Sequence, residues 1–232
     1  MKHIILAGDS VLDNGGYVIG PSVAEQITQA LSPDKVVSVA MDGAVSQGVI
    51  HQIRTYNQSN KATHLVIIVG GNDALGLSGL LQSNAIVRIE DFLTELANVR
   101  KEFAQDYTSM IEAVKTGYPN LSIIVATVYY PVFPTAEQRR AIGLLSMFND
   151  VILSVAATYQ LPVIDLRWIS SRPSCYANSI EPSVYGGKRI AKVIGSLFKN
   201  HRFEGPSAIY TYPKVKFRPE PFLRSDLFYE LE

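Results

Sequence analysis

Short apolar runs alternate with longer segments of helical periodicity along most of the chain. Runs with the character of β-strands lie at residues 3–7, 35–40, 63–69, 121–128 and 162–166. Between and after them, the spacing of apolar residues and helix-start signals predict helices over 22–31, 45–56, 90–116, 137–159 and 182–198. Apolar strands separated by helices are typical of a parallel sheet covered on both faces. We therefore predict an α/β fold, a three-layer α/β/α sandwich with a flavodoxin-like, doubly wound sheet of five parallel strands.

Two of the predicted helices begin with recognisable signals. Ser22 and Glu25 form a capping box, in which each side chain satisfies a free backbone amide. Pro182 places a proline in the first turn of the last helix, where an amide proton is not needed. The segment from Leu75 to Ile89 is predicted to be a loop, and its length is typical of functional loops.

The chain divides near residue 200 into a domain and a tail. Residues 1–200 contain all the predicted strands and helices. Residues 201–232 combine many aromatic side chains with four prolines, Pro206, Pro213, Pro219 and Pro221. Such a segment cannot be one helix, yet it is too apolar for a typical disordered tail. We expect an extended tail that packs on the domain or on a second subunit, forming a homodimer.

The composition of the chain indicates which binding partners and which cellular compartment to expect. Twenty-one basic and twenty-one acidic side chains balance, so the chain has no net field that would attract nucleic acid or an anionic membrane surface. Unbroken apolar runs reach roughly 5 to 8 residues, short of the roughly 20 that span a bilayer. A single cysteine, Cys175, and a strand-like start instead of a signal peptide predict a reduced, cytoplasmic setting. No spacing of His, Cys and carboxylates indicates a metal site.

Polar clusters follow three of the predicted strands. They are Gly8-Asp9-Ser10, Asp42-Gly43-Ala44 and Gly70-Gly71-Asn72-Asp73. Each alone has the composition of an ordinary turn. Because the carboxyl ends of parallel strands meet at one edge of a sheet, we expect the three clusters to converge. Together, a serine hydroxyl, an accessible glycine amide and an asparagine NH₂ supply a nucleophile and donors for an oxyanion.

These clusters resemble motifs of the SGNH or GDSL hydrolases, the family of GDSL-like lipases and esterases. That family has Gly-Asp-Ser, a glycine after the second strand, Gly-x-Asn-Asp after the third, and Asp-x-x-His-Pro before the last helix. The resemblance extends over residues 3–197. It implies that Ser10 attacks an acyl carbon, while the Ser10 amide, the Gly43 amide and the Asn72 side chain hold the oxyanion. It also implies a small ester or acylated substrate and chemistry that needs no cofactor.

The fourth motif lacks its histidine. Asn178 stands where the family has aspartate, and Glu181 stands where it has histidine, although residues 185–191 match the family well. The other histidines are expected at the opposite edge of the sheet, within a helix or after the last helix; they are His3, His51, His64 and His201. Glu181 is therefore the candidate base.

Glutamate is a weaker base than histidine. Its pKa is about two units lower, which costs about 3 kcal/mol of driving force for proton transfer. A nearby helix N-terminus lowers the pKa of Glu181 further, whereas burial raises it. An aspartate at 178 would repel Glu181, and we expect the Asn178 amide to donate a hydrogen bond to the carboxylate instead.

Candidates for substrate contacts lie beside these groups. They are Asp9, Asp73 and Tyr129, although Asp73 is also suited to orienting its own loop and Tyr129 to capping the core. Further candidates for the pocket wall are Val11, Leu12, Asp13, Asn14, Leu75, Tyr130 and Pro131. Asp165, at the end of the fifth strand, either supports the last loop or forms a turn.

Two functions remain open on these residues. The first is a serine hydrolase that cleaves a small ester or acyl group, with Ser10 as nucleophile and Glu181 as an atypical base. The alternative is a non-catalytic binding protein that uses Asn72, Asn178 and Glu181 to hold a small polar ligand in the same pocket. A nucleotide binder of the flavodoxin type is disfavoured because the glycine-rich phosphate motifs are absent from the sequence.

Overall fold

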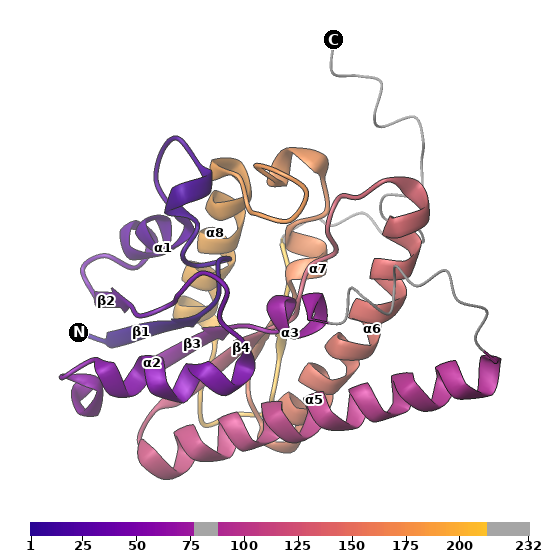
Figure 1. Ribbon diagram of the computed structural model, residues 1–232. Helices are drawn as coiled ribbons and strands as arrows, with labels where there is room; N and C mark the ends of the chain where they lie inside the picture. Colours follow the sequence, from indigo (N-terminus) through magenta and orange to yellow (C-terminus); the bar gives the residue numbers. More distant parts are fainter. Residues whose placement is uncertain (77–87, 213–232) are drawn as a thin grey trace.

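A six-stranded parallel sheet forms the centre of the molecule, with helices on both faces (Figure 1). The computed structural model describes residues 1–76 and 88–212. The sheet order is β2-β1-β3-β4-β5-β6. The strands are β1 (His3–Gly8), β2 (Lys35–Ser38), β3 (His64–Ile68), β4 (Ser122–Ala126), β5 (Val163–Ile164) and β6 (Ile209–Tyr210). The chain winds in both directions from β1, so the expected doubly wound α/β sandwich is confirmed.

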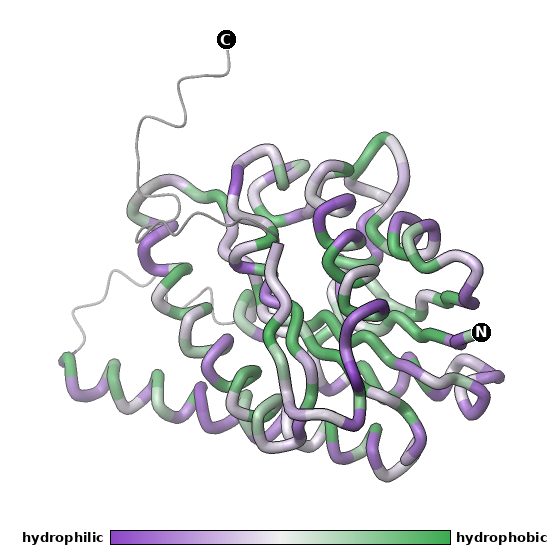
Figure 2. Tube along the Cα trace, turned by 180° about the vertical axis from the view of Figure 1, so that it is seen from behind, coloured by the Kyte–Doolittle hydropathy of each residue, from purple (hydrophilic) through white to green (hydrophobic). Residues whose placement is uncertain are grey.

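Helices form the two outer layers. They are α1 (Val23–Leu31), α2 (Val49–Thr55), α3 (Gly71–Leu75), α5 (Ile89–Gly117), α6 (Thr135–Thr158), α7 (Leu166–Ile169) and α8 (Val184–Asn200). Short 3₁₀ turns lie at Gly15–Tyr17, Ser46–Gly48, Ser59–Lys61 and Pro173–Cys175. One face of the sheet carries α1 and α8, and the other carries α2, α5 and α6. Hydrophobic residues concentrate in the sheet between these layers (Figure 2).

The alternation of side chains along β1 explains the two cores. Ile4 and Leu6 pack with Ile27 of α1 on one face, whereas Ile5 and Ala7 pack with residues of α2 on the other. Successive side chains of a strand point to opposite faces, so a strand covered on both sides needs an unbroken apolar run. β1 is buried from its second residue onward for this reason.

The sheet has one strand more than the sequence predicts. Ile209–Tyr210 pairs in parallel with β5, in the register Val163↔Ile209. A strand of two residues is too short to show any periodicity, so this segment reads as part of the tail. Residues 213–232, which make up most of that tail, lie outside the described residues. The packing of this part of the tail and the homodimer therefore stay predictions. The predicted functional loop falls mostly on 77–87, which also lie outside them.

Helix boundaries follow the start signals closely, with two corrections. The capping box is confirmed, because Glu25 N donates to Ser22 Oγ at 3.2 Å and Ser22 N donates to Glu25 Oε2 at 2.7 Å. Pro182 does not lie in the first turn of α8; Ser183 caps that helix by accepting from Gly186 N at 3.1 Å. The helix predicted over 45–56 is divided into a 3₁₀ turn and α2.

Helix α6 is the only helix of the described residues that is long and apolar enough to cross a membrane. Half of its apolar stretch is buried inside the domain, as in the core helix of a sandwich. Ser146, Asn149 and Asp150 interrupt the stretch, so counting unbroken apolar runs in the sequence underestimates it. Its inward residues line the face of the sheet that also carries α5.

A buried glutamine fixes the end of β1. Gln52 of α2 is 3% exposed; its Oε1 accepts from Gly8 N and its Nε2 donates to Gly8 O, each at 2.8 Å. Gly8 has a φ of +141°, and a Cβ there would lie 1.8 Å from the carbonyl oxygen of Ile68. Only glycine allows this approach of β1 to β3. Residues 9 and 10 therefore leave the sheet from a fixed point.

Replacing Gln52 with leucine should destabilise the domain by about 1 to 3 kcal/mol, because the Gly8 amide loses its buried partner and the Gly8 carbonyl keeps only the hydrogen bond from Met41 N. Urea unfolding followed by circular dichroism measures the difference. Gln47→Leu is the matched control, since Gln47 is exposed and should change stability by about 0.5 kcal/mol or less. Equal stability of the two variants would contradict the role given to Gln52.

Candidate active site

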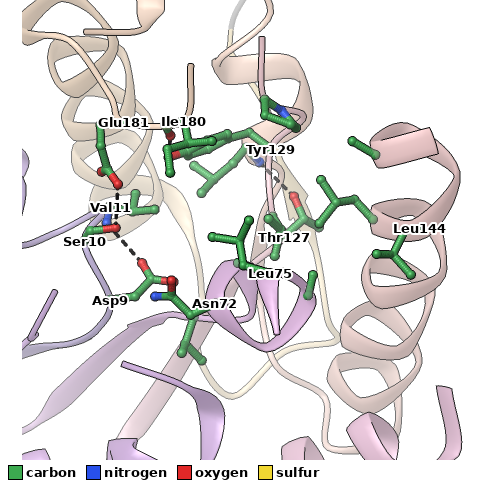
Figure 3. A pocket seen from close by; sticks show the side chains of 18 of the residues that line it. Asp9, Ser10, Val11, Asn72, Leu75, Thr127, Tyr129, Leu144, Ile180 and Glu181 are labelled. Carbon is green, nitrogen blue, oxygen red and sulfur yellow. Dashed lines mark hydrogen bonds between the residues drawn. The ribbon is translucent and has the colours of Figure 1, made fainter. Parts of the chain in front are cut away.

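Ser10 projects from the turn that follows β1 and meets Glu181. Its Oγ donates a hydrogen bond to Glu181 Oε1 at 2.9 Å (Figure 3). Ser10 is 9% exposed and Glu181 is 4% exposed. The turn is held by Asp9, whose amide donates to Ile68 O at 3.0 Å and whose Oδ1 accepts from Val11 N at 3.0 Å. The turn after β1 and the segment before α8 thus each contribute one side chain to a buried hydrogen-bonded pair, Ser10 and Glu181.

Asn178 shapes the loop that carries Glu181. Its Oδ1 accepts from Ile180 N at 2.9 Å and from Glu181 N at 2.8 Å. The expectation that Asn178 donates to the carboxylate is wrong, because its side-chain oxygen folds back onto the backbone as an Asx turn. Within the described residues, Glu181 Oε2 is buried and has no hydrogen-bond partner.

Burial sets the electrostatics of Glu181. It raises the pKa of the carboxyl above the ordinary value of 4.5, the hydrogen bond from Ser10 lowers it, and the charge of Asp42 raises it. The net direction is upward, so desolvation outweighs the stabilisation of the carboxylate. The base at this site is therefore stronger than an exposed glutamate.

Asp9 is a second buried carboxyl beside the nucleophile. It is 2% exposed, and its pKa is raised to about 7. Burial is the largest cause and the charges of Glu181 and Asp73 add to it, while the hydrogen bond from the Val11 amide acts in the opposite direction. Figure 3 shows the Asp9 carboxyl next to the side chain of Asn72. Asp9 is thus a group whose charge changes near neutral pH.

The second and third loops are joined by Asn72. Its Nδ2 donates to Ala44 O at 3.0 Å, which leaves the other proton of the NH₂ group for a ligand. Gly43, with a φ of +77°, precedes Ala44. Gly43 does not line the cavity beside Ser10, whereas Asn72 does. The three sequence clusters therefore meet, with Gly43 farther from the cavity than Asn72.

The candidates for substrate contact divide into two kinds. Asp9 and Tyr129 line the cavity, whereas Asp73 does not. Asp73 accepts from Ser46 N at 3.1 Å and from Ser46 Oγ at 2.6 Å, so it ties α3 to the loop after β2 and does not orient its own loop. The hydroxyl of Tyr129 donates to the carbonyl of Ile180, which leaves the ring facing the cavity.

The histidines lie away from Ser10. His3 and His64 occupy the amino ends of β1 and β3, at the edge of the sheet opposite Ser10. His201 follows the end of α8, and His51 is exposed on α2. Across residues 1–76 and 88–212, no group of three or more His, Cys, Asp or Glu side chains is arranged to hold a metal ion.

Asn14 joins the nucleophile loop to the Glu181 loop. It is fully buried; its Nδ2 donates to Pro182 O at 2.9 Å, and its Oδ1 accepts from Val23 N at 2.8 Å. In the sequence it reads only as a wall residue, and it does not line the cavity. Asparagine is common in loops, so the sequence carries no signal for this role. The hydrogen bond from Asn14 to Pro182 O holds the Glu181 loop against the nucleophile loop and so keeps Glu181 within reach of Ser10.

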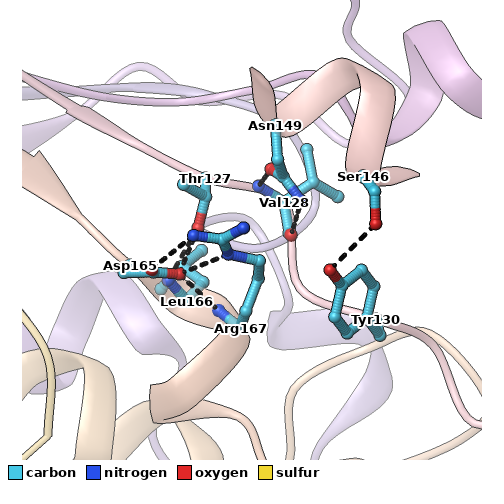
Figure 4. Close-up of polar contacts among 8 residues, drawn as sticks. All are labelled: Thr127, Val128, Tyr130, Ser146, Asn149, Asp165, Leu166 and Arg167. Atoms are coloured by element: carbon cyan, nitrogen blue, oxygen red, sulfur yellow. Dashed lines mark hydrogen bonds and ion pairs between the residues drawn. The ribbon is translucent and has the colours of Figure 1, made fainter. Parts of the chain in front are cut away.

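The floor of the cavity rests on a second polar network (Figure 4). Thr127 Oγ1 donates to Asp165 Oδ1 at 3.0 Å and accepts from Leu166 N at 2.9 Å. Asp165 also pairs with Arg167 at 2.7 Å and caps α7, so it both supports the loop and forms its turn. Asn149 of α6 binds N and O of Val128 at 2.7 and 2.9 Å, which fixes the wall beyond Thr127.

A cavity of about 430 Å³ opens beside Ser10. Its polar end contains Asp9, Ser10, Asn72 and Glu181. Sequence reasoning missed the apolar part of the wall that α6 contributes, which includes Ala141, Leu144 and Leu145. Their spacing of three and four positions predicts one apolar helix face but does not say what that face covers.

Comparison with known proteins finds solved structures that share this fold. The chain resembles phospholipase A1 from Streptomyces albidoflavus (17% identity, TM-score 0.61, 85% of this chain and 99% of that one). It also resembles a lipase/acylhydrolase from Enterococcus faecalis (19%, 0.62, 86% and 96%) and the lipase Lip_vut3 from a goat rumen metagenome (17%, 0.66, 83% and 95%). At these identities the likeness shows the shared fold.

A search of curated proteins found no match. The sequence pattern of one family matches residues 6–186, which is more than half of the chain. These residues include Ser10, Asn72 and Glu181. The chain therefore belongs to the GDSL-like lipase/acylhydrolase family.

Proposed function

We propose that the protein is a serine hydrolase that cleaves a small carboxylic ester, with Ser10 as nucleophile and Glu181 as base. The observation that carries this proposal is the buried hydrogen bond of 2.9 Å from Ser10 Oγ to Glu181 Oε1. A nucleophile within hydrogen-bond reach of a base is the geometry that serine chemistry needs. Cytoplasmic location, expected from the sequence, stays a prediction beside this proposal.

The reaction follows from the positions of these groups. Glu181 takes the hydroxyl proton as Ser10 Oγ attacks the ester carbon, and the carbonyl oxygen becomes an oxyanion. The free proton of Asn72 Nδ2 and the Ser10 amide stabilise that charge, and in the described residues this amide makes no other hydrogen bond. Glu181 then gives the proton to the departing alcohol. Water attacks the acyl-serine by the same route and restores Ser10.

Gly43 enters this proposal with a smaller role than the family pattern implies. It does not line the cavity, so its amide would have to approach when an ester is bound. Its φ is +77°, and its amide makes no hydrogen bond within the described residues, so the amide is available as a donor. Asn72 and Ser10 are therefore the main oxyanion donors in the proposal.

A specific observation keeps a second function under test. Glu181 Oε2 is buried without a partner, which also suits a site that only binds a polar ligand. Under that alternative, the native protein does not hydrolyse esters. The double variant Asn178→Asp with Glu181→His, which restores the family's Asp and His, should then gain ester hydrolysis. Turnover by the native chain that depends on Ser10 excludes the alternative.

Ser10→Ala should lower the hydrolysis of short-chain aryl esters by about 10³-fold or more, since it removes the nucleophile. Release of the phenol by purified protein, followed by absorbance, measures the rate. Ser109→Ala is the matched control, because Ser109 is exposed on α5 and should leave the rate unchanged. Equal rates for Ser10→Ala and the native protein would end the proposal.

The pH dependence should identify the base. The active form of Glu181 is the carboxylate, so kcat/KM should fall as the pH drops through its pKa, which burial holds above 4.5. Glu181→Gln should abolish that acid limb together with most of the rate. Asp9→Asn should keep it; if the limb instead disappears with Asp9→Asn, Asp9 and not Glu181 is the titrating group.

A further inference from the structure

Carboxyl groups from three loops gather around Ser10. Asp9 and Asp13 belong to the loop after β1, Asp42 to the loop after β2, and Glu181 to the loop before α8. Figure 3 shows the carboxyl groups of Asp9 and Glu181 on two sides of the Ser10 hydroxyl. Asp13 and Asp42 are exposed, so they face solvent beyond the buried Glu181. We call Asp13, Asp42 and Glu181 the acidic rim.

Hydrogen bonds and charge connect the members of the acidic rim. Asp42 N donates to Asp13 Oδ2 at 3.0 Å, and the hydroxyl of Tyr17 donates to Asp42 Oδ2 at 2.5 Å. This second hydrogen bond is the largest cause that raises the pKa of Tyr17 to about 12; desolvation and the charges of Asp42, Glu181 and Asp13 add to it. The three carboxylates are therefore close enough for each to act on the same ligand.

The negative charge of the acidic rim is not balanced by basic side chains. Across residues 1–76 and 88–212, no lysine or arginine forms an ion pair with a member of the rim or with Asp9. Arg140 of α6 lines the cavity, but Glu137 lines it too and carries the opposite charge. The whole chain has no net charge, so the excess of negative charge is local to the site. A cleft lined by one sign of charge attracts ligands of the other sign.

One acceptor of the acidic rim is buried and unused. Glu181 is 4% exposed, and its Oε1 accepts from Ser10, whereas its Oε2 has no hydrogen-bond partner within the described residues. Burial of such an oxygen costs free energy unless a donor reaches it. Glu181 lines the cavity, so a bound ligand can supply that donor. A protonated amine brings both an N–H donor and a positive charge, and charge-assisted hydrogen bonds of this kind are strong.

The direction of the reaction places the alcohol part of an ester at the acidic rim. In the proposed reaction, the bond between the acyl carbon and the alkoxy oxygen breaks, and that oxygen takes the proton which Glu181 received from Ser10. The alkoxy oxygen therefore lies beside Glu181, and its substituent is the part of the substrate nearest to Asp13 and Asp42. A positive charge on the alcohol, and not on the acyl group, meets the rim.

We propose that the acidic rim binds a protonated amine in the alcohol part of the substrate, so that the preferred substrates are esters of amino alcohols. This inference rests on the proposed hydrolase function. One pair of opposite charges in contact corresponds to roughly fivefold in an equilibrium constant in water, and to more where the pair is partly buried. With several carboxylates acting together, we expect a preference of about tenfold or more.

The test compares two acetates of the same shape. 2-(Dimethylamino)ethyl acetate is positively charged at neutral pH, and 3-methylbutyl acetate is its uncharged carbon analogue. Release of acetic acid, followed in a pH-stat, gives kcat/KM for each ester. The ratio should favour the amine ester by about tenfold or more at low ionic strength, and it should shrink as NaCl is added, because salt screens exposed charges.

Two variants show whether this ratio comes from the acidic rim or from the ester itself. Asp42→Asn and Asp13→Asn should each lower the ratio by about threefold, and the double variant should lower it further. Both substitutions keep an oxygen that accepts the hydrogen bond from Tyr17 or from residue 42. Asp91→Asn is the matched control, because it removes the same charge from an exposed position on α5 and should leave the ratio unchanged.

The ratio for the two esters does not change when part of the protein is unfolded, so it reports on preference alone. Equal kcat/KM for the two esters in the native protein would overturn the inference while the hydrolase function stands. A ratio that the double variant leaves unchanged would do the same.

Binding separates this inference from the proposed function. NMR titration of Ser10→Ala with 2-(dimethylamino)ethyl acetate should show binding, and adding Asp13→Asn and Asp42→Asn should weaken it by about fivefold or more. If neither ester is cleaved but the amine ester binds in this way, the hydrolase function fails and the amine site stands. If the amine ester does not bind, or binds equally well without the two aspartates, the amine site is wrong.

Discussion

The hydrogen bond between Ser10 and Glu181 joins positions 171 residues apart in the sequence, and the site depends on it. It closes only because β1 ends at the same edge of the sheet as the loop before α8. Burial of the pair raises the pKa of Glu181 and so makes a carboxylate a better proton acceptor. In the proposed function, the fold thereby offsets part of the disadvantage of glutamate relative to histidine.

Three buried side-chain amides hold the backbone around this pair. Gln52 satisfies both backbone groups of Gly8, Asn149 does the same for Val128, and Asn14 links the nucleophile loop to Pro182. Each provides hydrogen bonds to backbone groups where a strand ends or a loop passes through the interior. A site on loops thus gains the rigidity that precise chemistry needs.

Much of the architecture is predictable from the sequence, because buried strands require unbroken apolar runs and helices show their caps. The turns containing Ser10 and Asn72 were predictable for the same reason, since strand ends determine where they meet. The role of Asn178 was not, because a side-chain amide can either donate from its nitrogen to a carboxylate or accept backbone amides with its oxygen. Strand β6 and the hydrogen bond from Asn14 to Pro182 O depend on contacts between segments far apart in the chain, and such contacts leave no local pattern in the sequence.

The most direct test of the central claim is the rate at which a fluorophosphonate labels Ser10, followed by intact-protein and peptide mass spectrometry. The probe reacts with an activated serine by displacement of fluoride, so the rate reports on the nucleophile without need of a substrate. The account predicts a single adduct on Ser10 and labelling at least a hundredfold slower in Glu181→Gln. An adduct elsewhere, or the same rate in native protein and Glu181→Gln, would contradict it.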